Sequence, residues 1–111
     1  MCTKRIKDDL ENLASYIERQ FLRGLLRIAI LVILDRSSRY GYQIYKILRE
    51  KLYSKLSLST LYTLLKELEN KGLIRRIDDK YILTEKGSKL IKLLFTRYNK
   101  LLNDIRIRIE V

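Results

Sequence analysis

Residues 56–83 read LSLSTLYTLLKELENKGLIRRIDDKYIL, and this pattern predicts a helix, a stop and a hairpin. Ser57 can cap the helix, because its hydroxyl can accept an otherwise unpaired backbone N–H of the first turn. Gly72 can end the helix in the left-handed conformation, and Leu73 can then fold back onto Leu68 in a Schellman contact. Between these ends, apolar residues recur at helical spacing in one stripe: Leu58, Leu61, Leu64, Leu65 and Leu68.

The face opposite this stripe is small and polar. On a helical wheel it holds Ser59, Thr63, Lys66, Glu67 and Asn70, with Thr60 and Tyr62 on its flanks. Side chains of these types can approach the base edges and phosphates of DNA closely. For Tyr62 two interpretations stand side by side: contact with DNA, or packing against a neighbouring helix.

The residues after Gly72 predict two short strands, 73–77 and 80–83, joined by a turn at Asp78 and Asp79. Three positive charges lie on this hairpin: Arg75, Arg76 and Lys80. They could guard a solvated strand edge against aggregation. After a helix-turn-helix, the favoured interpretation is a basic wing that grips the sugar-phosphate backbone.

Length and charge place limits on the whole chain. At 111 residues it is expected to be a single domain, 1–111, with a modest core. The formal net charge of +11 indicates an anionic partner, although many Lys and Arg could simply solvate helices. The charge is uneven: residues 1–20 carry four basic and four acidic groups, whereas residues 36–80 carry eleven basic and five acidic groups. The excess therefore lies on the segment with the helix-and-hairpin pattern.

The sequence lacks the side chains that most catalytic and metal sites use. It has no His, and its single cysteine, Cys2, can form no internal disulfide. It contains no metal-ligand cluster, Gly-rich phosphate loop or nucleophile elbow. We therefore expect no enzymatic activity and no cofactor. The abundance of Ile, Leu, Lys and Glu is typical of a thermophile.

No targeting or membrane segment is expected. The N-terminus is charged from Lys4 and has no early apolar core, unlike a secretory signal. The most apolar run, residues 22–34, is interrupted by Arg23 and Arg27 and is shorter than the roughly 20 residues of a membrane span. We expect a cytoplasmic protein with no membrane partner.

Three helices are expected before residue 57. Residues 4–20 form the first, with an a/d seam at spacings of four, three and four: Ile6, Leu10, Leu13 and Ile17. Residues 21–34 are apolar on nearly all sides, as in a central helix contacted from several directions. Gly24 either permits close approach of another helix or marks a join between two helices. Residues 40–53 form the third helix, and a short turn leads into the helix that Ser57 caps, which completes a helix-turn-helix.

Thr84 can cap a last helix, expected over residues 84–105. A second a/d seam runs along it: Ile91, Leu94, Tyr98, Leu101 and Ile105. Seams at opposite ends of the chain predict a homodimer, and the alternative is that the second seam covers the chain's own core. Beyond about residue 105, Ile alternates with charged residues in a way that also fits a strand, so no conformation is predicted there.

An ordered set of motifs over residues 28–90 resembles the PadR-like winged helix-turn-helix transcription regulators. It comprises Tyr40-Gly41-Tyr42 with Gln43-Ile44, Thr60-Leu61-Tyr62, Leu65, Leu68, Gly72-Leu73-Ile74, Tyr81, Leu83-Thr84 and Gly87. The resemblance implies a dimeric, repressor-type DNA-binding protein with a wing, a dimerising C-terminal helix and a recognition helix at residues 57–71. The proportions are similar to those of small archaeal and viral regulators. The wing departs from the family pattern, since its turn contains only Asp78 and Asp79.

The expected fold is therefore mainly α with a small β-hairpin: a winged helix-turn-helix core at 21–83 between N- and C-terminal dimerisation helices. The expected partner is double-stranded DNA, with base edges contacted by Ser59, Thr60, Tyr62, Thr63 and Asn70, and phosphates by Lys66, Arg75, Arg76, Lys80, Arg39, Lys46 and Lys55. Two alternatives stay open: an architectural protein that coats DNA without sequence choice, and a winged-helix protein-interaction module.

Overall fold

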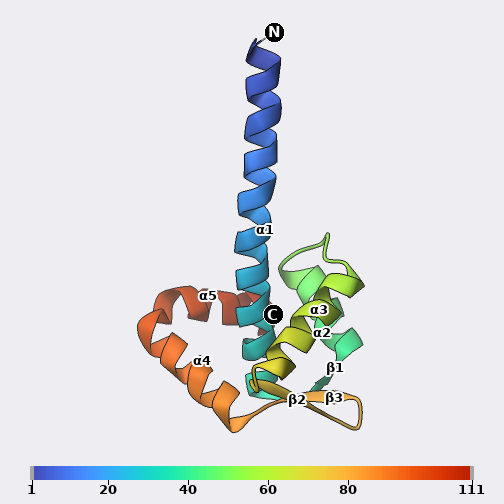
Figure 1. Ribbon diagram of the computed structural model, residues 1–111. Helices are drawn as coiled ribbons and strands as arrows, with labels where there is room; N and C mark the ends of the chain where they lie inside the picture. Colours follow the sequence, from blue (N-terminus) through green and yellow to red (C-terminus); the bar gives the residue numbers. More distant parts are fainter. Residues whose placement is uncertain (1, 111) are drawn as a thin grey trace.

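The computed structural model describes residues 2–110 as five helices and three short strands (Figure 1). In chain order they are α1 (Cys2–Arg36), β1 (Arg39–Tyr40), α2 (Gly41–Lys51), α3 (Leu58–Asn70), β2 (Ile74–Ile77), β3 (Lys80–Leu83), α4 (Glu85–Arg97) and α5 (Asn99–Glu110). The pair α2–α3 followed by the β2–β3 hairpin is a winged helix-turn-helix, as the sequence predicts. None of the helices within residues 2–110 has the length and apolarity needed to cross a lipid bilayer.

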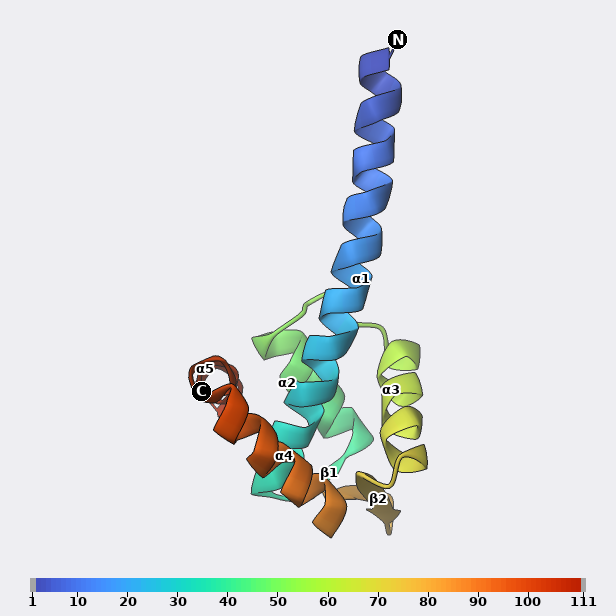
Figure 2. The ribbon, with the colours of Figure 1, turned by 60° about the vertical axis from the view of Figure 1, so that its left-hand side comes forward.

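Helix α1 is one continuous helix, not the two expected at 4–20 and 21–34. Gly24 lies inside it, and a Cβ added there would meet no other atom within 4 Å, so it marks neither a join nor a close approach. A single glycine costs a helix only about 1 kcal/mol, and no proline interrupts this one. Residues 3–21 are exposed, and this half of α1 projects from the rest of the molecule (Figures 1 and 2).

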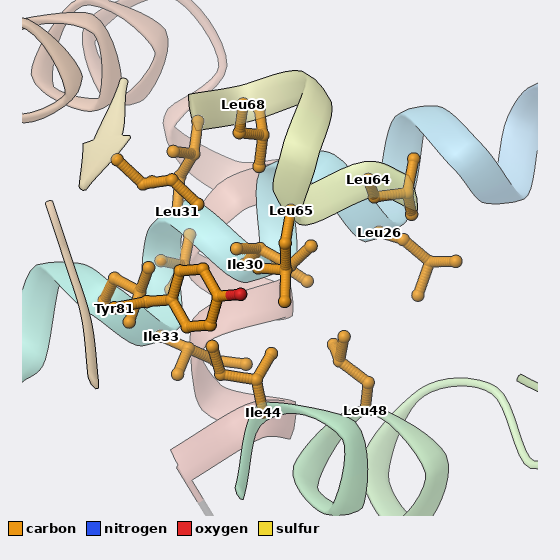
Figure 3. Packing of buried hydrophobic residues seen from close by; sticks show 14 of the residues in the cluster. Leu26, Ile30, Leu31, Ile33, Ile44, Leu48, Leu64, Leu65, Leu68 and Tyr81 are labelled. Carbon is orange, nitrogen blue, oxygen red and sulfur yellow. The ribbon is translucent and has the colours of Figure 1, made fainter. Parts of the chain in front are cut away.

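The C-terminal half of α1 runs through the middle of the core. Leu26, Ile30 and Ile33 are buried there among side chains from α2, α3 and β3 (Figure 3). From α2 the core receives Ile44 and Leu48, from α3 it receives Leu61, Leu64, Leu65 and Leu68, and from β3 it receives Tyr81. This helix is apolar on several sides because several elements cover it at once.

The small sheet has three strands in the order β1-β3-β2, one strand more than the expected hairpin. Strand β1 pairs antiparallel with β3, with Arg39 opposite Tyr81 and Tyr40 opposite Lys80. The sequence predicts no strand here, and residue 40 was expected to begin the third helix. Two residues carry too little periodicity to be recognised, and they become a strand only because β3 offers them a free edge.

The signals at the ends of the elements are confirmed. The Ser57 hydroxyl accepts the backbone N–H of Thr60 at 3.2 Å and caps α3. At the other end Gly72 has φ +74°, and the Leu73 N–H donates to the Leu68 carbonyl at 3.0 Å, which is the expected Schellman bond. The Thr84 hydroxyl accepts the N–H of Gly87 at 3.0 Å and caps α4.

The hairpin turn also lies where it was expected, at Asp78 and Asp79. Both residues have positive φ, at 50° and 67°. A two-residue turn with positive φ at both positions matches the right-handed twist of the strands that it joins. The hairpin therefore has the shortest connection that two antiparallel strands use, and its tip projects little beyond them.

The C-terminal region forms two helices instead of the single helix expected at 84–105. Helix α4 ends at Arg97, and the backbone changes direction at Tyr98. Helix α5 then runs back along α1 and α2 on the side opposite α3 (Figure 2). Leu102 and Ile105 are buried there, and Arg36 forms an ion pair with Glu110 at 2.6 Å. The alternation of Ile with charged residues at the end of the chain is therefore helical through Glu110, because burial on α1 and α2 selects the helical face.

Two glycines allow a test of this packing. A Cβ at Gly87 would lie 2.1 Å from the Leu73 carbonyl oxygen, whereas Gly24 has open space. We expect Gly87→Ala to lower the free energy of unfolding by about 1–3 kcal/mol, since α4 must move away from Leu73. Gly24→Ala should raise it by up to about 1 kcal/mol through helix propensity. Urea unfolding followed by circular dichroism measures both, and a Gly87→Ala protein as stable as wild type would contradict this packing.

Candidate nucleic-acid interface

The outer face of α3 is exposed, whereas its inner face is buried. Its inner residues Leu61, Leu64, Leu65 and Leu68 are buried. The remaining member of the predicted stripe, Leu58, is 44% exposed, because it lies in the first turn and beyond the edge of the core. The polar residues of the outer face are exposed, as the helical wheel predicts: Ser59, Thr63, Lys66 and Asn70.

Hydroxyl groups cluster at the start of α3 and are already partly bonded. The Ser57 hydroxyl donates to that of Thr60 at 2.8 Å, and Thr60 is half-buried. The Thr63 hydroxyl donates to the Ser59 carbonyl one turn earlier at 2.9 Å. Since its proton is used inside the helix, Thr63 is left with lone pairs that can accept a hydrogen bond from a base amino group.

The position of Tyr62 is compatible with both of its predicted roles, packing against a neighbouring helix and contact with DNA. Its ring lies against the start of α2, where a Cβ at Gly41 would be 2.6 Å from the phenol oxygen. The side chain is nevertheless 42% exposed beside the outer face of α3. A side chain at position 41 would push the Tyr62 ring aside, so the glycine of the Tyr-Gly-Tyr motif lets the ring lie against α2 while part of it stays exposed.

Glu67 differs from its expected place on the outer face. It turns toward α1, where the Arg27 guanidinium donates to its two carboxylate oxygens at 2.6 and 3.2 Å. These hydrogen bonds from Arg27 lower the pKa of the Glu67 carboxyl below its ordinary value of 4.5. The pair ties α3 to α1 and neutralises a carboxylate that would otherwise repel DNA phosphates.

The register of the wing sends its cations to two different faces of the sheet. Arg76 lies opposite Tyr81, on the face that carries the buried side chains and covers the helices, and its guanidinium lies 5.4 Å from the centre of the Tyr81 ring. Arg75 lies opposite Ile82 on the other face, because side chains alternate along a strand. Lys80 shares that other face, with its ammonium 5.1 Å from the Tyr40 ring centre.

Tyr81 stays neutral beneath Arg76. Burial raises the pKa of its phenol above the ordinary value of 10.0, although the nearby Arg76 charge opposes this shift. A neutral ring attracts a guanidinium over its face by a cation–π contact. The Tyr81 ring therefore holds the Arg76 guanidinium on the face of the wing that covers the helices.

Two arginines outside the predicted set of DNA contacts lie beside the start of α3. Arg19 and Arg23 of α1 line one shallow hollow together with Lys55, Ser57 and Thr60. Their spacing of four residues places both on one side of α1, and Arg27 continues the same row toward α3. This row could have been found in the sequence as arginines that recur every four residues.

Two predicted phosphate contacts lie apart from this surface. Arg39 is half-buried in a hollow formed by α1, α2 and α5, and its buried Nε has no hydrogen-bond partner among residues 2–110. Lys46 is exposed on α2, beside Tyr42, Tyr45 and Arg49. The structure thus gathers Lys55, Lys66 and Arg76 around α3 but does not bring Arg39 and Lys46 to them.

The two predicted dimer seams lie in different environments. All four residues of the first seam project into solvent, with exposed fractions between 53% and 61%: Ile6, Leu10, Leu13 and Ile17. In the second seam Ile91 and Ile105 are buried within their own chain, Leu94 is half-buried, and Tyr98 and Leu101 are exposed. The break at Tyr98 divides the second seam between core and surface.

Comparison with known proteins identifies the fold and the family. Residues 30–93 match the sequence model of the Transcriptional regulator PadR-like family, which covers more than half of the chain. Among curated protein sequences none matches the chain.

Solved structures agree with the family match. Bacillus subtilis PadR is 28% identical over 66% of this chain, with a TM-score of 0.60, and the chain spans only 42% of that protein. A transcriptional regulator from Clostridium thermocellum is 27% identical and aligns over 77% of this chain and 93% of its own, also at 0.60. A PadR family transcription regulator from Clostridium difficile is 29% identical over 71% of this chain and 95% of its own, at 0.56.

The Arg27–Glu67 pair predicts a pH dependence. A carboxyl with a lowered pKa in the folded state stabilises the fold above its unfolded pKa, and this stability is lost as the pH falls through the folded value. Glu67→Gln should therefore reduce the free energy of unfolding most at neutral pH, and the difference from wild type should shrink below about pH 4. Urea unfolding at a series of pH values measures this. Glu85→Gln, which removes an exposed pair with Lys89, is the control; an equal effect there would contradict a special role for Glu67.

Proposed function

The chain belongs to the Transcriptional regulator PadR-like family, and we propose that it regulates transcription as a homodimer that places α3 in the major groove of DNA and the wing on the backbone. One observation carries the proposal. The leucine face of α3 is buried in the core while its opposite face is exposed, with cations near the N-terminal end of the helix and in the wing that follows it. A helix held in this way can enter a groove without any change of fold.

Base edges would meet the outer face of α3. Asn70 can both donate to and accept from an adenine edge, whereas Thr63 can accept from an amino group because its own proton is used within the helix. Ser59, Thr60 and Tyr62 complete the candidate set, with Tyr62 restricted to its exposed edge. No arginine stands on this face for a bidentate contact with guanine, so DNA shape would contribute to the choice of site.

Phosphates would be contacted on both sides of α3. Beyond its C-terminal end, Arg76 is presented on the helix side of the wing by Tyr81. Near the N-terminal end, Arg19, Arg23 and Lys55 add a second cationic group beside the capped first turn. Two groups separated by the length of α3 can bind the backbones on either side of one groove and so set the register of the helix.

A homodimer is supported by the exposed seam on α1. Four large apolar side chains at coiled-coil spacing lie in solvent in the single chain, and soluble proteins bury such a surface against a partner. Two copies would present two α3 helices to successive major grooves.

An architectural role without sequence choice remains the second candidate, because α3 lacks a guanine-reading arginine. A footprint separates the two: protection of a defined operator supports regulation at a specific site, whereas uniform protection along the DNA supports coating.

DNA affinity should fall steeply with salt. If each complex neutralises about 6–10 phosphates, the association constant is expected to fall by roughly 10³–10⁵ between 50 and 200 mM salt. Fluorescence anisotropy with a labelled duplex measures this slope. A flat response would contradict phosphate binding and would favour a role in protein–protein interaction.

The two wing arginines form a matched pair for testing the interface. Arg76→Gln should weaken binding to all sequences by about the same factor and reduce the salt slope by about one. Arg75→Gln removes the same charge from the opposite face of the strand and should weaken binding less. Thr63→Val or Asn70→Ala should instead change the preferred sequence. An equal loss for both arginines would show that the face of the wing does not matter.

A further inference from the structure

We propose that α1 pairs with α1 of a second copy in antiparallel orientation, about a two-fold axis between Leu10 and Leu13, and that this pairing sets the distance between the two α3 helices. The proposal rests on the homodimer proposed above and adds its geometry. The seam residues are Ile6, Leu10, Leu13 and Ile17.

The projecting half of α1 needs a partner. Residues 3–21 are helical and exposed along their whole length, and Arg19 near their end lines the hollow beside α3. Isolated helices of this length are marginal in water, and most helical stability in proteins comes from the packing of an apolar face. The exposed seam supplies such a face, so a helix packed on it would stabilise the whole segment.

The seam is symmetric under reversal. Its spacings are four, three and four residues, and its side chains run Ile, Leu, Leu, Ile. An antiparallel copy centred between the two leucines therefore places Ile6 opposite Ile17 of the partner and Leu10 opposite Leu13 of the partner. Each of the four seam residues therefore faces a seam residue of the partner, as knobs-into-holes packing requires.

Charge favours the antiparallel orientation. Lys4, Arg5 and Lys7 occupy one turn of α1, and three acidic residues occupy the next: Asp8, Asp9 and Glu11. Parallel pairing in register would place six cations at one level and six carboxylates at the next. Antiparallel pairing places the basic turn opposite residues 16–19, where Glu18 and Arg19 cancel, and the acidic turn opposite the uncharged residues 12–15. Both like-charge overlaps are removed.

The direction in which α3 faces also favours this symmetry. Leu64 and Leu65 of α3 point into the core beside the side chains of α1 (Figure 3), so the opposite, polar face of α3 points away from α1. A two-fold axis parallel to α1 would turn the second polar face in the opposite direction, away from a shared duplex. An axis perpendicular to α1 lets both polar faces lie on the same side.

The resulting distance fits DNA. Thr60 lies beside Arg23, and Glu67 bonds Arg27, which locates α3 along α1. With 1.5 Å per residue measured from an axis between positions 11 and 12, the two copies of α3 would be separated along the direction of α1 by about 35 Å at Thr60 and about 47 Å at Glu67. Half-sites one helical turn apart are separated by about 34–36 Å, so the start of each α3 would match successive major grooves.

Engineered disulfides test the orientation. In a Cys2→Ser background we would compare Ile6→Cys, Ile17→Cys and the double variant, each oxidised with diamide and run on a non-reducing gel. In the antiparallel pair, equivalent positions are about 16 Å apart along the helices, beyond the reach of a disulfide. Position 6 lies opposite position 17 of the partner.

We expect the Cys2→Ser parent to be a dimer by analytical ultracentrifugation, each single variant to stay uncrosslinked, and most of the double variant to become a covalent dimer. A mixture of the Ile6→Cys and Ile17→Cys variants should also form the disulfide. In this mixture each chain carries only one altered seam position. Crosslinking of either single variant alone, an uncrosslinked double variant or a monomeric parent would overturn the proposal. The salt dependence of DNA binding tests the proposed function separately, since it depends on α3 and the wing and not on how the copies pair.

Discussion

The contact between the leucine face of α3 and the C-terminal half of α1 is the constraint on which the remaining features depend. Leu64 and Leu65 are buried with Leu26 and Ile30, and the rotation of α3 about its own axis follows from that packing (Figure 3). A turn of the helix by one residue would place polar side chains in an apolar core at a cost of several kcal/mol. The polar face is therefore held outward by the core behind it.

The smaller contacts around this core adjust what the outer face can bind. Arg27 holds the Glu67 carboxylate toward α1, and Gly41 leaves room for Tyr62 to lie against α2 while part of its ring stays exposed. In the wing, the register with β3 presents Arg76 on the helix side. Composition shows only that the protein is basic. These contacts fix where the donors, acceptors and charges lie on the outer face.

The large apolar surface at the two ends of the chain is used in two ways. The C-terminal residues turn back at Tyr98 and bury Leu102 and Ile105 against their own chain. The N-terminal half of α1 has no such route, because a continuous helix carries it away from the core. The same type of a/d pattern therefore closes the core at one end and leaves an exposed seam at the other.

Local sequence determined those features whose cause lies within a few residues. The cap at Ser57, the left-handed Gly72 with its Schellman bond, the turn at Asp78 and Asp79, and the leucine stripe of α3 each depend on short-range chemistry, and the structure confirms them. The ordered motifs around them also identified the family. Three features of the backbone follow only from tertiary structure: the third strand, the continuity of α1 and the break at Tyr98. Two side-chain placements do so as well: Glu67 turns from the outer face toward α1, and Arg19 and Arg23 lie beside α3. Each of these depends on a partner far away in the chain, and periodicity shows that a side chain needs a partner without showing which one it meets.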